Sequence, residues 1–185
     1  MGTADVQIAL ARVTGRLDEL GIPYAVCGGL AVNAHGYART TTDVDLLITA
    51  EGLRRFKDAS LGLGWLERFA GSRGVRDTDR RVPIDFLLAG GIPGDGKPHG
   101  VVFPDPVGVT IEKAGTRFLA LAKLIELKLA SGVSLPHRLQ DLADVAKLIE
   151  VNALGEHFGY QLHPWVRPKY AELWRNAQAR DPQAE

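Results

Sequence analysis

Hydrophobic residues recur along the chain with two different periods, and together these periods predict a mixed α/β fold. Apolar positions spaced three and four residues apart predict helices over 3–20, 30–35, 51–59, 116–130, 137–151 and 168–179. Short apolar or alternating runs predict strands over 25–27, 43–49, 65–70 and 81–88, and one or two more within 101–111; the strands over 65–70 and 81–88 are expected to form a hairpin. We therefore expect a mixed, twisted sheet of roughly four to six strands flanked by helices.

The pattern changes from mixed to helical at Gly115. We expect residues 1–114 to form the core and residues 115–185 to form a C-terminal helical part packed on it as a single compact unit.

The strand predicted over 43–49 begins with two acidic residues at alternating positions, Asp43 and Asp45. Side chains at i and i+2 of a strand lie on one face, about 7 Å apart, so the two carboxylates point the same way. Ionised carboxylates that close repel each other unless a cation lies between them. A solvated strand end is the alternative, and it is the better interpretation of an isolated Asp-x-Asp.

Two glycines, Gly28 and Gly29, follow the first predicted strand. Glycine permits a tight turn and a close approach of a ligand to the backbone. The helix expected to open at Leu30 would present an N-terminus that favours an anion. An ordinary turn is the alternative interpretation.

The succession of strand, Gly-Gly turn, helix and acidic strand resembles the signature of the nucleotidyltransferase superfamily, the polymerase-beta-like fold. More narrowly, it resembles the AbiEii-type abortive-infection toxins and their uncharacterised relatives, through the motifs Gly28-Gly29-Leu30-Ala31, His35-Gly36 and Arg39-x-Thr41-x-Asp43-x-Asp45-Leu46. The resemblance spans most of residues 24–144. It implies that the two aspartates hold two Mg²⁺ ions, with Mn²⁺ as an alternative metal, and that Gly28, Gly29, Arg39 and Thr41 bind the substrate.

Asp85 interrupts the apolar strand predicted over 81–88. A buried carboxylate costs several kcal/mol unless it is paired or bound to a metal. On the sequence alone, a salt bridge to Arg80 or Arg81 is as good an explanation as a metal site. The superfamily places a third carboxylate on a strand beside the Asp-x-Asp strand, so the resemblance implies that Asp85 is a third metal ligand and catalytic residue.

In the helical part, Lys123 and Glu126 are expected on the solvent side of their predicted helix, and Lys128 falls on the side opposite them. Either its stem lies along apolar surface with the ammonium in solvent, or the ammonium is directed at a ligand phosphate. The run Leu127–Ala130 followed by Arg138-x-x-Asp141-x-x-Asp144 resembles the third and fourth AbiEii-type motifs. That resemblance implies Lys128 and Asp141 in substrate binding.

The second of these motifs departs from the pattern, because Gln140 stands where the relatives usually carry a basic residue. An ion pair between Asp141 and Arg138, and a surface position for Asp144, are the alternatives.

Composition narrows the function classes. The 22 basic and 22 acidic residues give no net charge, so no global field recruits nucleic acid, although a local basic patch is compatible with neutrality. One cysteine excludes an intramolecular disulfide framework, and we see no signal peptide or membrane-spanning run, so we expect a cytoplasmic protein. Residues 91–97 nearly spell a P-loop, but Pro98 stands where a Ser or Thr must reach magnesium.

The resulting expectation is an enzyme that moves a nucleoside monophosphate from an NTP to an acceptor hydroxyl or phosphate and releases pyrophosphate. The AbiEii-type resemblance implies a tRNA or protein acceptor and a toxin with a cognate antitoxin. A small-molecule adenylyltransferase similar to aminoglycoside- or lincosamide-modifying enzymes is the closest enzymatic alternative. An inactive module that binds a partner or senses nucleotides is the alternative from another class.

Overall fold

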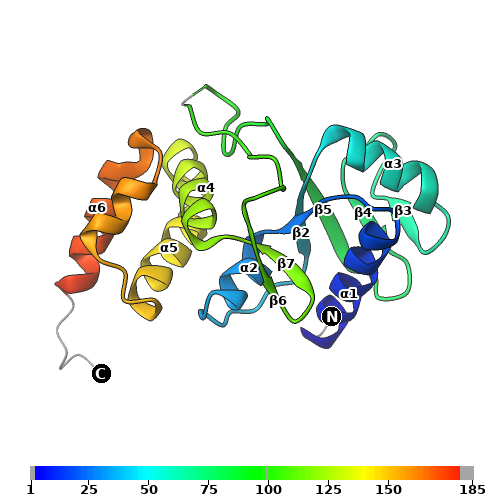
Figure 1. Cartoon of the computed structure of the whole chain (residues 1–185), viewed down its shortest axis with the longest axis horizontal. Helices are drawn as coiled ribbons and strands as arrows, with labels where there is room; N and C mark the ends of the chain where they lie inside the picture. The colour runs from blue at the N-terminus through cyan, green and yellow to red at the C-terminus, as the bar shows by residue number, and fades with distance from the viewer. Residues whose placement is uncertain (1–2, 99, 180–185) are drawn as a thin grey trace. The chain divides into compact units, whose positions relative to one another are not determined.

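The computed structural model describes residues 3–98 and 100–179, and it divides the chain into two compact units (Figure 1). The first, here called the sheet unit, comprises the chain up to Ala34, then Ala38–Gly90 and Phe103–Ala120. The second, the helical unit, comprises His35–Tyr37, Gly91–Val102 and the chain from Leu121 onward.

The sheet unit is built on seven strands in the spatial order β3-β4-β5-β2-β1-β7-β6. The pairs β2–β5 and β1–β7 are parallel and the remaining pairs are antiparallel, which confirms the predicted mixed sheet. The strands are β1 (Ala25–Val26), β2 (Val44–Ile48), β3 (Trp65–Glu67), β4 (Val75–Asp77), β5 (Pro83–Leu88), β6 (Thr110–Lys113) and β7 (Thr116–Leu119).

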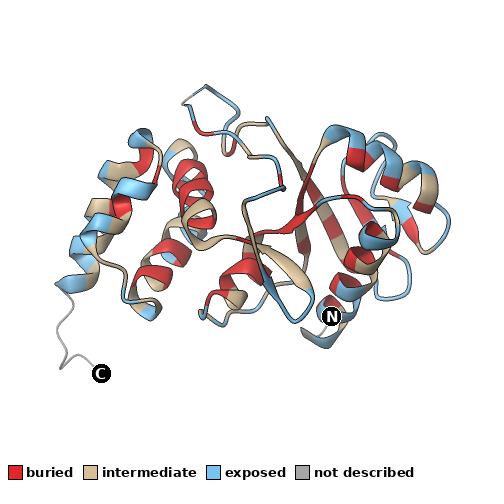
Figure 2. Ribbon diagram, viewed as in Figure 1, coloured by how far each residue is buried: buried red, intermediate tan, exposed pale blue. Residues whose placement is uncertain are grey.

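Three helices belong to the sheet unit: α1 (Thr3–Glu19), α2 (Gly28–Ala34) and α3 (Ala50–Ser60). Helix α3 begins directly after β2, where the Thr49 hydroxyl accepts a hydrogen bond of 3.0 Å from the Gly52 amide and so caps the helix. One hydrophobic cluster joins these helices to the sheet, and its members are buried (Figure 2). Fully burying one such side chain stabilises the fold by about 1.5–3 kcal/mol. The cluster includes Val13 and Leu17 of α1, Phe56 of α3, Leu46 of β2 and Ile84 of β5.

The helical unit contains α4 (Leu121–Ser134), α5 (Leu139–Val151) and α6 (Arg167–Gln178), with short 3₁₀ helices over Glu156–Gln161 and Pro164–Val166. Tyr170 of α6 is fully buried, and its hydroxyl donates to the Gly155 carbonyl at 2.9 Å. Burial raises the pKa of Tyr170 to about 12, so this hydroxyl stays a donor at any physiological pH.

The predicted helix over 116–130 is wrong at its beginning, because Thr116–Leu119 is strand β7 and α4 starts only at Leu121. Strand β7 forms a hairpin with β6 through Ala114 and Gly115, which both have positive φ, at 49° and 74°. Two consecutive residues with positive φ form the type of turn that matches the twist of a hairpin. Strand β7 also pairs with β1, so its backbone groups find partners on both sides.

Two other expectations are corrected. The predicted strands around 65–70 and 81–88 do not form a hairpin with each other, because β4 lies between β3 and β5 and pairs with both. Glu126 is not on the solvent side of its helix: it is buried, and it accepts hydrogen bonds from Lys123 and from the His163 amide. Within the described ranges, no helix is both long and apolar enough to cross a membrane.

Candidate active site

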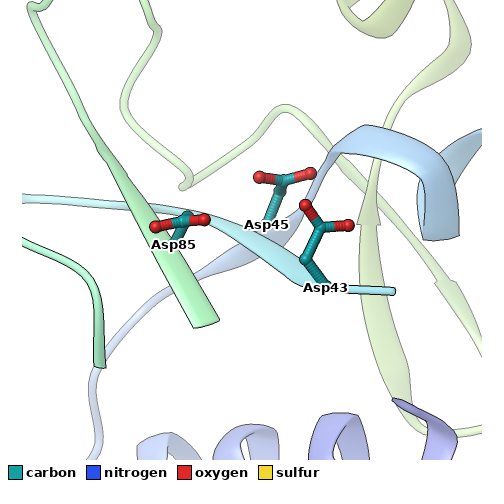
Figure 3. A group of neighbouring side chains, drawn as sticks. All are labelled: Asp43, Asp45 and Asp85. Atoms are coloured by element: carbon teal, nitrogen blue, oxygen red, sulfur yellow. The ribbon is translucent and has the colours of Figure 1, made fainter. Parts of the chain in front are cut away.

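Three carboxylates meet where β2 lies beside β5. The parallel register of these strands places Asp45 directly opposite Asp85, and Asp43 precedes the first residue of β2. Each of the three offers an oxygen, and these oxygens lie within 4.8 Å of one another (Figure 3). All three residues are half-buried.

Strand periodicity explains why the carboxylates share one face. Val44, Leu46 and Ile48 belong to the hydrophobic core, so the alternating positions of β2 point to the opposite face. The same holds for β5, where Ile84 and Phe86 enter the core on either side of Asp85. Asp85 is therefore not a charge within the core: 38% of its side chain is exposed, and the sequence-based argument from full burial is corrected.

At the start of α2, Gly28 lies against the Asp45 carboxylate and Gly29 lies against Thr41 and Arg39. Gly28 has a φ of +56°, and a Cβ at this position would lie 1.8 Å from Asp45 Oδ2. A Cβ on Gly29 would lie 2.8 Å from the Thr41 hydroxyl and 3.1 Å from Arg39 Nη2. Both positions exclude larger residues, because carbon cannot approach an oxygen that closely without displacing it.

The loop that leads into β2 holds Asp43 in place. The Thr41 hydroxyl donates to Asp43 Oδ1 at 2.8 Å. The Asn33 side chain of α2 accepts from the Arg39 amide and donates to the Arg39 carbonyl, each at 2.9 Å. Asn33 thus fixes the loop to the helix, and nothing in the sequence pattern singled it out.

The partner of Asp85 is Arg68, and not Arg80 or Arg81 as considered from the sequence. Arg68 Nη1 lies 2.7 Å from one carboxylate oxygen of Asp85 and 3.0 Å from the other. Arg80 lies 3.8 Å from Asp5 instead. The sequence did not reveal Arg68, because the intervening β4 brings it to Asp85 from 17 residues away.

Lys128 and Asp141 belong to the helical unit, where they form a buried ion cluster with Asp144. Lys128 Nζ lies 2.8 Å from Asp141 Oδ1 and 2.7 Å from Asp144 Oδ2. The lysine side chain is 8% exposed and that of Asp144 is 0% exposed, so neither a solvent-directed ammonium nor a surface acid describes this site.

The N-terminal end of α5 adds to this cluster. Arg138 Nη1 lies 3.7 Å from Asp141, which is the pairing expected at this spacing, and Gln140 donates to Asp144 at 2.8 Å. The roles of Lys128 and Asp141 in substrate binding stay predictions.

Comparisons with known proteins identify the class of fold. No family model matches the sequence, and no curated protein matches it either. Solved structures do match. The crystal structure of ANT(2'')-Ia with adenylyl-2''-tobramycin superposes with a TM-score of 0.58 at 16% identity, over 92% of this chain and 98% of the other.

Two further structures agree. The solution structure of the antibiotic-resistance factor ANT(2'')-Ia gives a TM-score of 0.60 at 18% identity, over 97% of this chain and 100% of the other. An antigenic nucleotidyltransferase-like protein from Paracoccidioides brasiliensis gives 0.55 at 18% identity, over 95% and 90%. The chain therefore has the predicted nucleotidyltransferase fold, with a trio of aspartates on its sheet.

Proposed function

We propose that this protein is a metal-dependent nucleotidyltransferase that moves a nucleoside monophosphate from an NTP to an acceptor. The observation that carries the proposal is the meeting of Asp43, Asp45 and Asp85 within 4.8 Å on a nucleotidyltransferase fold. Gly28 lets the backbone at the start of α2 lie against the Asp45 carboxylate, where a larger residue would displace it.

The donor set fits a hard divalent cation. Three carboxylates supply only oxygen ligands, the type that Mg²⁺ and Mn²⁺ prefer. Three negative charges this close repel one another, and Arg68 offsets one of them. Asp43, Asp45 and Asp85 would hold the metal, which when bound would offset charge on the attacking and leaving oxygens of an in-line displacement.

The residues of the chain would then act as follows. Asp85 accepts the proton of the acceptor hydroxyl while the oxygen of that hydroxyl forms a bond to the α-phosphorus. The bond from the α-phosphorus to the β-bridging oxygen breaks, and pyrophosphate leaves. Thr41 orients Asp43 through its 2.8 Å hydrogen bond. Arg39, placed by Asn33, contributes a cation for phosphate oxygens.

Lys128 and Asp141 are proposed to act together in this scheme. A phosphate that met Lys128 would compete with the two carboxylates that now surround it. Asp141 is the more exposed of these carboxylates, at 15% against 0% for Asp144, so it is the one that would yield.

The acceptor has two candidate classes, each favoured by one observation. The whole-chain likeness to a structure that contains adenylyl-2''-tobramycin favours the hydroxyl of a small, polar compound. The AbiEii-type motifs favour an RNA or protein acceptor and a toxin with a cognate antitoxin. The complete trio argues against an inactive binding module, which has no need for three neighbouring carboxylates.

Transfer of label tests the activity and identifies the acceptor class. Protein, Mg²⁺ and each of the four NTPs, labelled in turn at the α- and the γ-phosphate, are incubated with tobramycin, with total RNA or with a protein lysate. We expect α-label to enter one acceptor pool and γ-label to appear only in pyrophosphate. Label transfer from the γ-phosphate would instead show a kinase.

The matched variants are Asp43→Asn and Asp58→Asn. Asp58 is an exposed acid of α3 in the same unit, so its substitution removes an equal charge outside the trio. We expect Asp43→Asn to abolish transfer and Asp58→Asn to retain it. Equal transfer by both variants would remove the trio from the active site.

A further inference from the structure

Arg68 reaches Asp85 across the intervening strand β4, in a row of residues that continues to Asp45. Asp45 of β2 lies opposite Asp85 of β5. A Cβ built on Gly74, which precedes β4, would lie 2.6 Å from Asp85 Oδ1, and the Gly74 carbonyl accepts from the Arg68 amide at 3.4 Å. The row therefore runs from Arg68, just after β3, past Gly74, just before β4, to Asp85 of β5 and Asp45 of β2.

Gly74 is the one residue of this row without a side chain. Its φ lies outside the left-handed region, so the backbone conformation does not require glycine. Lack of space requires glycine instead, because a Cβ would also lie 3.2 Å from Cδ of Arg68. Because Gly74 has no side chain, the arginine can lie across this strand and reach a carboxylate two strands away, roughly 10 Å at the usual strand spacing.

Arg68 lies in the connection between the antiparallel strands β3 and β4, and the preceding residue, Glu67, holds this connection in place. Glu67 accepts from Lys57 Nζ at 2.6 Å and from the Gly71 amide at 3.0 Å. Lys57 first, and then the Gly71 amide, hold the pKa of Glu67 below its ordinary value. The acid beside Arg68 in the sequence is thus committed elsewhere, and the guanidinium is directed to Asp85.

Resting on the proposed function, we propose that Arg68 is a displaceable counter-ion of the metal site. In the metal-free protein it neutralises Asp85. When a divalent cation binds the trio, Asp85 turns to the cation and the Arg68 guanidinium transfers to an anionic oxygen of the nucleotide. Both residues are suited to this exchange, because their side chains are 40% and 38% exposed and no packed core has to open. Arg68 is then a positioning residue that links metal binding to nucleotide binding.

The test measures binding of Mn²⁺ alone by the loss of the free-ion EPR signal, and binding of a non-hydrolysable NTP analogue at saturating Mn²⁺ by titration calorimetry. We expect Arg68→Ala to bind Mn²⁺ alone roughly two- to fivefold more tightly than the wild type, the range that exposed ion pairs are worth. With the analogue present, the same variant should bind the nucleotide roughly tenfold more weakly, because a charge-assisted hydrogen bond is lost. Arg68→Gln provides a second variant with the same expected signs.

Arg73→Ala is the matched control, since Arg73 is an exposed arginine on the same hairpin and its loss removes an equal charge. It should change neither affinity, whereas a general charge effect would appear in both variants. Unchanged or weaker Mn²⁺ binding by Arg68→Ala, or unchanged nucleotide binding, overturns the proposed transfer. If Asp45→Asn binds Mn²⁺ as well as the wild type does, the trio is not the metal site and the proposed function fails as well.

Discussion

The two carboxylate clusters of this protein differ in how their charge is balanced. Around Lys128, two aspartates enclose one lysine in the interior of the helical unit, and Asp144 is fully buried. In the sheet unit, three half-buried aspartates lie within 4.8 Å of one another, and Arg68 meets one of them at the exposed edge. A buried charge demands a partner within the fold, whereas a like-charged cluster open to solvent is suited to an external cation.

The comparison predicts its largest effect for Asp45→Asn. Losing one ligand of the proposed metal site should raise the activation free energy of nucleotidyl transfer by about 4 kcal/mol, which lowers the rate on the order of a thousandfold. The free energy of unfolding in the absence of metal should not fall, because one of three repelling charges is removed. Transfer rates and urea unfolding curves of the purified variant check both parts. If Asp45→Asn instead unfolds the protein, the three aspartates stabilise the fold and do not form a metal site.

Lys128→Met should have the opposite profile, with stability as the quantity that changes. Removing the lysine leaves Asp141 and Asp144 buried without their cation, which costs about 3–5 kcal/mol in the free energy of unfolding. Lys147→Met, on α5 of the same unit, removes a lysine that is 40% exposed and whose partner Glu150 is 26% exposed, and it should cost at most about 1 kcal/mol. Urea unfolding measures both. Equal stability of the two variants would mean that the cluster does not hold the helices, and would favour a Lys128 that serves only the nucleotide.

A third prediction separates backbone strain from crowding of the site. Gly28→Ala and Gly21→Ala both place a Cβ at positive φ, at 56° and 60°, which costs each about 1–2 kcal/mol. At Gly21 nothing lies within 4 Å of that Cβ, whereas at Gly28 it meets the Asp45 carboxylate. Gly21→Ala should lose only the stability that strain costs, whereas Gly28→Ala should lose more because the Asp45 side chain must move, and only Gly28→Ala should lose Mn²⁺ binding. Retained binding in Gly28→Ala would show that Asp45 does not need this position.

The smallest expected effect concerns Thr41. Thr41→Val keeps the shape of the side chain and removes its hydrogen bond to Asp43, worth about 1 kcal/mol or roughly a fivefold loss of transfer rate. Thr42→Val, at the neighbouring exposed position, is the control and should retain the full rate. If the two variants are equally active, Asp43 does not depend on Thr41 for its orientation.

Short-range patterns were sufficient for the strands that carry the trio. The alternation of Val44, Leu46 and Ile48 with the acidic positions fixed which face of β2 enters the core, and the structure confirms it. The pair Gly28-Gly29 was visible in the sequence, but the expected turn is wrong, because the two residues are the first of α2.

Contacts between distant segments were not accessible in the same way. Strand β7 has an apolar pattern compatible with a helix, and its pairing with β1 and β6 decides its conformation. Arg68 and Asn33 carry no local signal, since their roles depend on which strand or loop the fold brings beside them. The burial of Lys128 likewise depends on the packing of α4 against α5.

The most direct test of the metal site is a pair of melting experiments on the wild type and Asp85→Asn, each with and without Mg²⁺. A ligand that binds only the folded state stabilises it by about 2.7 kcal/mol at a hundredfold excess over its Kd. The account predicts a clear upward shift for the wild type and a much smaller one for Asp85→Asn, which lacks one of three carboxylates. If Asp85 serves only as the partner of Arg68, the two proteins will instead differ by the same amount with and without Mg²⁺, and that constant difference would remove Asp85 from the metal site.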